Sequence, residues 1–210
     1  MKKLALIPCL LFQLLVVAQD KLLTLEDAFL RARTTLAPQN LSQLQFFGNT
    51  NDYVYLSKTG NTDAWMKGNF KTKNEAPYLT LQQLNGYLRN AGFDTAAAMP
   101  PIKFGVDGWQ MTIKNNKILL MPTLKQYRLL LPAQFAGKEN ADESKAGFVA
   151  WTENFNLFVT QFTNTAIGKT VQVTTDGNRN LLYGTSVHRE EFGISKGTFW
   201  SNSGTQLAFY

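Results

Sequence analysis

The chain has 210 residues, a formal net charge of +6 and the composition of an ordinary globular protein, with 44% hydrophobic, 17% charged and 12% aromatic residues. This length is enough for one domain with a core of its own, or for one domain and part of another. The 21 basic and 15 acidic residues are spread along the chain, which argues against a nucleic-acid-binding stripe. Because His188 is the single histidine, a metal site built from several histidines is excluded, and no cofactor is implied.

The first residues have the pattern of a secretory signal. Lys2 and Lys3 precede an apolar run over 4–17, and Ala18 ends a small-residue cleavage site. We therefore expect an exported protein, periplasmic or extracellular, with 1–18 as its signal peptide. A membrane anchor is the alternative, but the apolar run has 14 residues, fewer than the roughly 20 that a helix needs to span a bilayer. The mature chain would lack cysteine and would rely on packing rather than on disulfides.

Two short helices are expected. The hydroxyl of Thr24 can cap a helix over about 25–34, because the acidic residues that follow suit the positive end of a helix. After Thr80, leucines recur at intervals of three and four residues and predict a second helix, which ends near Gly92.

Most of the remaining chain has the pattern of β-strands. From Leu44 onward, aromatic and β-branched runs alternate with Gly, Asn and Asp turns, which is typical of hairpins. The segment 137–147 is polar and is expected to be a loop. Four short apolar runs follow, with starts about 8 to 14 residues apart, at 148–151, 156–159, 170–173 and 181–183. Four short strands per unit are typical of a propeller blade, although periodicity alone leaves an all-β sandwich open.

Three segments resemble parts of one enzyme family. Trp-Ser-Asn-Ser-Gly at 200–204 with Leu-Ala-Phe at 207–209 resembles the blade motif of the prolyl oligopeptidase family, with asparagine and serine in the usual proline and aspartate places. Val-His-Arg-Glu-Glu-Phe at 187–192 resembles the double-glutamate segment of the dipeptidyl peptidase IV branch. Lys-Gln-Tyr-Arg at 125–128 resembles the segment of that branch whose arginine points into the active-site cavity.

The resemblance implies an all-β fold, an incomplete eight-bladed β-propeller with short N-terminal and interlude helices. It divides the mature chain into an N-terminal segment at 19–43 and a partial propeller at 44–210 that is cut within a blade. A strand edge left unpaired there is prone to association, so we expect the isolated chain to be poorly soluble or oligomeric.

The resemblance also implies the chemistry of a serine peptidase that removes X-Pro or X-Ala dipeptides from peptides with a free N-terminus. Such an enzyme measures two residues from the substrate ammonium, and Glu190 and Glu191 suit an anionic anchor for it. The two carboxylates can converge only where 188–194 is not extended. Arg128 would donate to a substrate carbonyl or carboxylate, a role that suits a guanidinium. The alternatives are an exposed acidic pair and a surface arginine.

Gly-Ile-Ser-Lys-Gly at 193–197 matches the nucleophile elbow of α/β-hydrolases, but an elbow needs a strand before it, a helix after it, and an acid and a histidine further along. The 13 residues after Gly197 include no His, Asp or Glu, so Ser195 is not expected to be catalytic. By resemblance, the catalytic serine, acid and histidine would lie in a C-terminal α/β-hydrolase domain, and full-length members are often homodimers. This chain alone would then be inactive. The competing function is that of a secreted propeller-type binding protein without catalysis.

Overall fold

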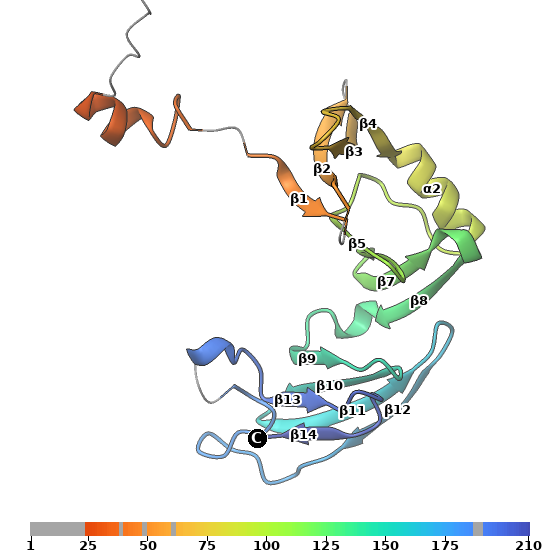
Figure 1. The fold of residues 1–210 in the computed structure, drawn as a ribbon. Helices are drawn as coiled ribbons and strands as arrows, with labels where there is room; N and C mark the ends of the chain where they lie inside the picture. Colours follow the sequence, from red (N-terminus) through yellow and green to blue (C-terminus); the bar gives the residue numbers. More distant parts are fainter. Residues whose placement is uncertain (1–23, 38–39, 48–49, 60–61, 187–190) are drawn as a thin grey trace, which may run out of the picture. The chain divides into compact units, whose positions relative to one another are not determined.

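The computed structural model describes residues 24–37, 40–47, 50–59, 62–186 and 191–210 (Figure 1). The chain divides into an N-terminal unit, Met1–Asn40, and a larger unit, Leu41–Tyr210.

The N-terminal unit contains a short helix that begins where Thr24 predicts it. The Thr24 hydroxyl oxygen accepts from the backbone N–H of Asp27 at 3.0 Å, and the Thr24 backbone N–H donates to the Asp27 carboxylate at 3.2 Å. This reciprocal pairing satisfies two backbone donors that a helix start leaves free. The helix is shorter than the predicted 25–34, because its last part, η1 (Asp27–Arg31), is a π-helical turn followed by isolated turns.

The larger unit consists of three four-stranded antiparallel sheets and a two-stranded one, and in each the strands follow chain order. The first sheet contains β1 (Ser42–Phe46), β2 (Asp52–Thr59), β3 (Thr62–Asn69) and β4 (Glu75–Thr80). The second contains β5 (Ile102–Gly105), β6 (Gly108–Ile113), β7 (Asn116–Met121) and β8 (Gln126–Leu131). The third contains β9 (Glu139–Glu143), β10 (Phe148–Glu153), β11 (Asn156–Phe162) and β12 (Ile167–Gln172), and the last contains β13 (Thr198–Trp200) and β14 (Leu207–Phe209). A four-stranded meander is the unit of a β-propeller, so the predicted incomplete propeller is confirmed.

One α-helix, α2 (Leu81–Asn90), connects the first and second sheets, as the leucine spacing predicts. The Thr80 side chain accepts from the backbone N–H of Gln83, whose side chain accepts from the backbone N–H of Thr80. Leu84 and Leu88 are fully buried. Gly92 follows the helix with φ of +78°, a conformation that glycine adopts without steric cost.

The third sheet corrects two predictions. Its first strand, β9, lies inside the segment 137–147 that was predicted as a loop, whereas the apolar run 181–183 lies outside the sheet. The polar sequence of β9 is compatible with a strand because its side chains pair with those of neighbouring sheets, as described below. Leu181 and Leu182 are 40% and 44% exposed, and Leu181 forms an isolated bridge with Asn178.

The first two sheets and α2 share one hydrophobic core. Phe104 on β5 is at its centre, with ring centroids 4.9 Å from Trp65, 5.5 Å from Trp109 and 5.6 Å from Tyr78. Trp65, on β3, is fully buried. Full burial of a large apolar side chain contributes about 1.5–3 kcal/mol, so this aromatic cluster is a main source of cohesion between the two sheets.

The second and third sheets meet over a smaller core. Phe135, Val149, Trp151 and Phe162 form a buried cluster, against which Leu129 and Leu131 of β8 pack. An ion pair between Lys117 on β7 and Glu143 on β9 spans the same junction.

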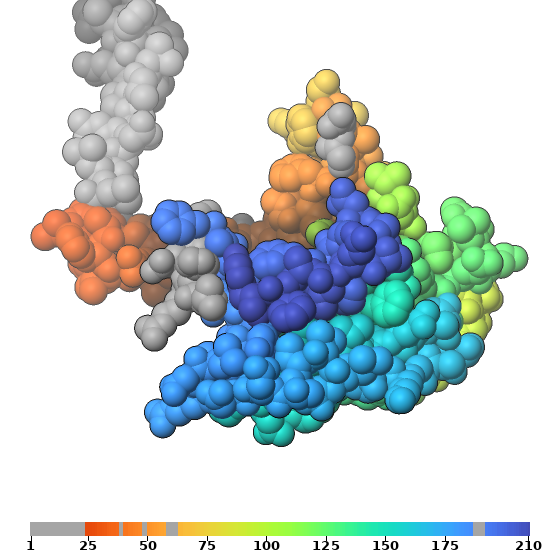
Figure 2. All heavy atoms as spheres, turned by 90° about the horizontal axis from the view of Figure 1, so that it is seen from below, coloured from red at the N-terminus to blue at the C-terminus, as the bar shows by residue number. Residues whose placement is uncertain are grey.

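Asp142 on β9 attaches the two-stranded sheet to the third. Its carboxylate accepts from Lys196 Nζ at 2.8 Å and from the Thr198 hydroxyl at 2.9 Å, and its backbone carbonyl accepts from Trp200 Nε1 at 3.1 Å. Figure 2 shows the C-terminal residues, in dark blue, packed on the strands of the third sheet. Polar residues of β9 therefore serve as inter-sheet contacts.

Asp52, at the start of β2, gives a test of pH dependence. Bonds from Lys67 Nζ at 2.9 Å and Asn69 Nδ2 at 2.7 Å hold the pKa of its carboxyl below the ordinary value. Because the folded-state pKa is the lower one, the carboxylate stabilises the fold above its ordinary pKa, and this stabilisation is lost as the pH falls through the lowered pKa. We expect Asp52→Asn to lower the melting temperature at about pH 7 and to have less effect near about pH 3. Equal melting temperatures at pH 7 by circular dichroism would contradict this.

Candidate functional site

One face of the second sheet carries a row of side chains that are neighbours across all four strands. Lys103 on β5 lies opposite Gln110 on β6. Gln110 in turn lies opposite Leu119 on β7, and Leu119 lies opposite Arg128 on β8. Directly opposite residues of an antiparallel pair point to the same face. Lys103 and Arg128 therefore share a face and stand on its two outermost strands.

Two adjoining cavities lie between this face and the third sheet. Their volumes are about 460 and 530 Å³, and both are lined by Arg128, Leu130, Ser144 and Lys145. Because they share these four residues, the cavities meet at Arg128. We call the pair the inter-sheet hollow. Lys103 lines the 530 Å³ cavity as well.

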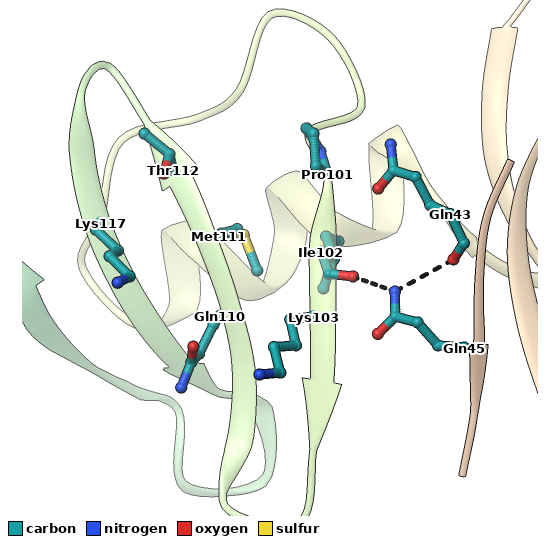
Figure 3. A pocket seen from close by; sticks show the side chains of 9 residues that line it. All are labelled: Gln43, Gln45, Pro101, Ile102, Lys103, Gln110, Met111, Thr112 and Lys117. Atoms are coloured by element: carbon teal, nitrogen blue, oxygen red, sulfur yellow. Dashed lines mark hydrogen bonds between the residues drawn. The ribbon is translucent and has the colours of Figure 1, made fainter. Parts of the chain in front are cut away.

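A third cavity, of about 340 Å³, adjoins the hollow at Lys103 and is shown in Figure 3. Its most constrained polar group is the Gln45 amide, which donates from Nε2 to the carbonyl of Ile102 at 2.6 Å and accepts from the backbone N–H of Phe104 at 3.0 Å. These are the two bonds that a neighbouring strand would make with the edge of β5. Both polar atoms of the amide are therefore used in bonds to the backbone. Buried Ile102 and Met111 give the cavity an apolar lining.

A second side-chain amide holds the backbone on both sides of Arg128. Asn164, between β11 and β12, donates from Nδ2 to the carbonyl of Tyr127 at 2.8 Å and accepts from the backbone N–H of Leu129 at 2.8 Å. Leu129 and Tyr127 pack into the core shared by the first two sheets, while Arg128 between them is exposed and lines the hollow. The strand around Arg128 is therefore fixed by packing and by hydrogen bonds.

The hollow carries an excess of positive charge. Three lysine and arginine side chains line it whose charged groups form no hydrogen bond or ion pair with any other residue that the structure describes. These are Lys103, Arg128 and Lys145. Two carboxylates also line the 530 Å³ cavity. Glu143 is paired with Lys117, whereas Asp107 forms no ion pair with any described residue. A concave surface lined mainly by one sign of charge concentrates ions of the other sign, so the hollow is suited to an anion.

Of the two predicted glutamates, the structure describes the backbone of Glu191 alone. Glu190 lies outside the described residues, and Glu191 begins the 3₁₀ turn η4 (Glu191–Gly193). The Ser186 hydroxyl donates to the carbonyl of Ile194 at 3.3 Å, which joins the two sides of the loop. The backbone at 191–193 is not extended, and whether the two carboxylates converge stays a prediction, because Glu190 lies outside the described residues.

Ser195 has the surroundings of an ordinary surface residue. The chain after it forms β13 and β14 rather than a helix, and the Ser195 side chain is exposed. Over the described ranges, it makes no hydrogen bond to a histidine or a carboxylate. The segment therefore lacks the helix that follows the serine in a nucleophile elbow.

Two kinds of feature are absent from the described part of the chain. It contains no group of three or more His, Cys, Asp or Glu side chains that could hold a metal ion. It also contains no helix long and apolar enough to cross a membrane.

Lys103, Lys145 and Asn164 are site residues that the sequence does not indicate. Lys103 joins Arg128 only through the register of four strands, which no sequence pattern specifies. Lys145 lies in a segment expected to be an unstructured loop, and Asn164 has the signature of an ordinary turn residue.

Comparison with known proteins agrees with this architecture. Residues 143–210 match the dipeptidyl peptidase IV (DPP IV) N-terminal region. A crystal structure from Bacteroides ovatus ATCC 8483, of a protein provisionally assigned as a dipeptidyl aminopeptidase IV, is similar to this chain at 30% sequence identity and a TM-score of 0.53. The similarity covers 81% of this chain and 22% of that one, so this chain spans about a fifth of the length of that protein.

The sheets and their order define this protein as part of a β-propeller. Within that class, residues 143–210 match the N-terminal region of dipeptidyl peptidase IV, and the chain is similar to a structure of that kind. The resemblance found in the sequence is confirmed at this level. The glutamate pair lies within the matched residues, and Arg128 lies before them.

Asn164 can be tested as the residue that holds β8 in place. In Asn164→Asp the carboxylate cannot donate to the carbonyl of Tyr127, so one exposed hydrogen bond is lost, and a typical hydrogen bond contributes about 0.5–1.5 kcal/mol. We expect urea unfolding of the chain to show a loss of this order. Asn202→Asp is the matched control, because Asn202 is exposed and its side chain bonds to no other described residue. An equal effect of the two substitutions would refute the assignment.

Proposed function

We propose that this chain is the substrate-binding propeller region of an exported serine dipeptidyl peptidase that removes X-Pro and X-Ala dipeptides. Glu190 and Glu191 anchor the substrate ammonium, and Arg128 donates to a carbonyl or carboxylate of the same peptide. The nucleophile, its acid and its histidine belong to an α/β-hydrolase domain with which this region works. The observation that carries the proposal is Arg128, a guanidinium that no described residue engages, at the junction of two cavities.

The proposed selectivity depends on attraction between the glutamate carboxylates and the charged N-terminal ammonium of the substrate. A carboxylate about 4 Å from an ammonium contributes roughly 4 kcal/mol of gross attraction at an effective dielectric of about 20, before desolvation is subtracted. A peptide whose amine is blocked loses this attraction and also leaves two carboxylates without their cation. Arg128 acts differently, because its planar donors recognise oxygen atoms whether or not the amine is free.

The family supports the coarser part of the proposal, a member of the dipeptidyl peptidase IV group. The signal pattern at 1–18 supports export. A propeller that binds without catalysis would share the hollow, but it would have no reason to require a free amine.

Binding of labelled peptides to the chain tests the anchor. We expect a peptide that begins Ala-Pro to bind about tenfold more tightly with a free amine than when N-acetylated, since hydrogen bonds to charged groups contribute about 1.5–3 kcal/mol. Glu190→Gln and Glu191→Gln should each reduce this difference. Arg128→Gln should weaken both peptides equally, whereas Arg179→Gln, an exposed arginine outside the hollow, should change neither. Equal affinity for the free and acetylated peptides, measured by fluorescence anisotropy, would exclude the anchor.

Ser195 gives a separate test in the protein that carries this region together with its hydrolase domain. Because Ser195 precedes a strand and has no base within bonding distance among the described residues, Ser195→Ala should leave turnover of an alanyl-prolyl chromogenic substrate unchanged. Loss of turnover with unchanged folding would show that the serine takes part in catalysis.

A further inference from the structure

We propose that the inter-sheet hollow binds acidic side chains of the substrate peptide beyond its N-terminal dipeptide, so that acidic peptides are preferred. The inference rests on the proposed function for the identity of the ligand as a peptide. The residues that make the selection are Lys103 and Lys145, neither of which takes part in the ammonium anchor.

Lys103 and Arg128 stand far enough apart for a peptide to fit between them. Strands in a sheet lie about 4.8 Å apart, so the three steps of the row from Lys103 to Arg128 place their Cα atoms about 14 Å apart. Lysine and arginine side chains are long, and both line the 530 Å³ cavity between them. The space that they border is within the range of about 300–1,000 Å³ that small-ligand sites occupy. It can hold more than one side chain of an extended peptide.

Lys145 approaches the same space from the third sheet on a fixed turn. The turn from Ser144 to Gly147 is closed by a bond from the Gly147 N–H to the Ser144 carbonyl at 3.2 Å. The Ser144 side chain is buried, accepts from the backbone N–H of Ala146 at 3.0 Å and donates to the carbonyl of Gly204. Lys145 is therefore carried by a backbone that is held on both sides, while its own side chain is exposed.

The charged groups of the hollow carry a net positive charge. Carboxylates near the hollow are mostly engaged, since Glu143 pairs with Lys117 and Asp142 accepts from Lys196 and Thr198. Asp107 is the carboxylate of the 530 Å³ cavity that forms no ion pair within the described ranges. Three unpaired cations against one carboxylate leave an excess of two positive charges. These cations repel one another in the empty site, and a ligand with two or more carboxylates relieves that repulsion.

The ligand that best matches the hollow is a peptide with acidic side chains. The family acts at the N-terminus of peptides, and the position of Arg128 at the junction of both cavities makes the hollow continuous with the proposed path of the peptide. In a peptide the groups that match unpaired lysines are the carboxylates of aspartate and glutamate. Long-range attraction of this kind depends on ionic strength, which supplies a diagnostic.

The experiment compares two labelled peptides that share the start Ala-Pro and differ afterwards in three glutamates or three glutamines. We expect the chain to bind the acidic peptide about tenfold more tightly at low salt, with the difference falling as salt is raised. Lys103→Gln and Lys145→Gln should each reduce the preference about two- to fivefold, the range of exposed ion pairs. Neither should change the affinity for the neutral peptide. Lys169→Gln, which removes the same charge from the exposed strand β12, is the control and should change nothing.

The conservative variants Lys103→Arg and Lys145→Arg separate charge from folding, because they should retain the preference. Equal affinity for the two peptides would overturn the proposal, and so would a preference that survives in the double Lys→Gln variant. The ammonium anchor fails by a different result, equal binding of free and acetylated peptides, so the two failures are distinguishable.

Discussion

The second four-stranded sheet has two faces and two edges, and the first and third sheets contribute cover to them. Its faces adjoin two shared cores, of which the cluster around Phe104 is the larger. The edges of the second sheet are covered by amides, since Gln45 bonds to β5 and Asn164 bonds to β8. Unpaired strand edges promote association, so an amide that repeats the bonding of a strand also makes pairing with another chain less favourable at that edge.

The same packing creates the candidate site. Two cavities between the second and third sheets meet at Arg128, and the hydrogen bonds of Asn164 fix the backbone beside it. Lys117 and Glu143 pair across this junction and remove one carboxylate from the charge of the hollow. Inter-sheet contacts thus determine both where the cations stand and which of them remain unpaired.

The sequence predicts much of this architecture, because local signals specify local structure. Thr80 and the leucine spacing locate α2, and the aromatic runs locate most strands. It fails at β9, a strand of polar residues stabilised by partners distant in sequence, and at 181–183, an apolar run that lies outside the sheets. For the site, a sequence motif indicates Arg128. Lys103 lies on the same face as Arg128 only because of the strand register, and Lys145 is placed by a turn that is bonded to Gly204. Both depend on long-range contacts that periodicity does not encode.

We propose that Arg128 and the hollow around it receive the substrate peptide. A crystal structure of the protein with a bound peptide that begins Ala-Pro and continues with glutamates would test this. We expect the Arg128 guanidinium within hydrogen-bonding distance of a peptide oxygen, with glutamate side chains of the peptide directed toward Lys103 and Lys145. A peptide that is bound elsewhere, with Arg128 left in solvent, would contradict it.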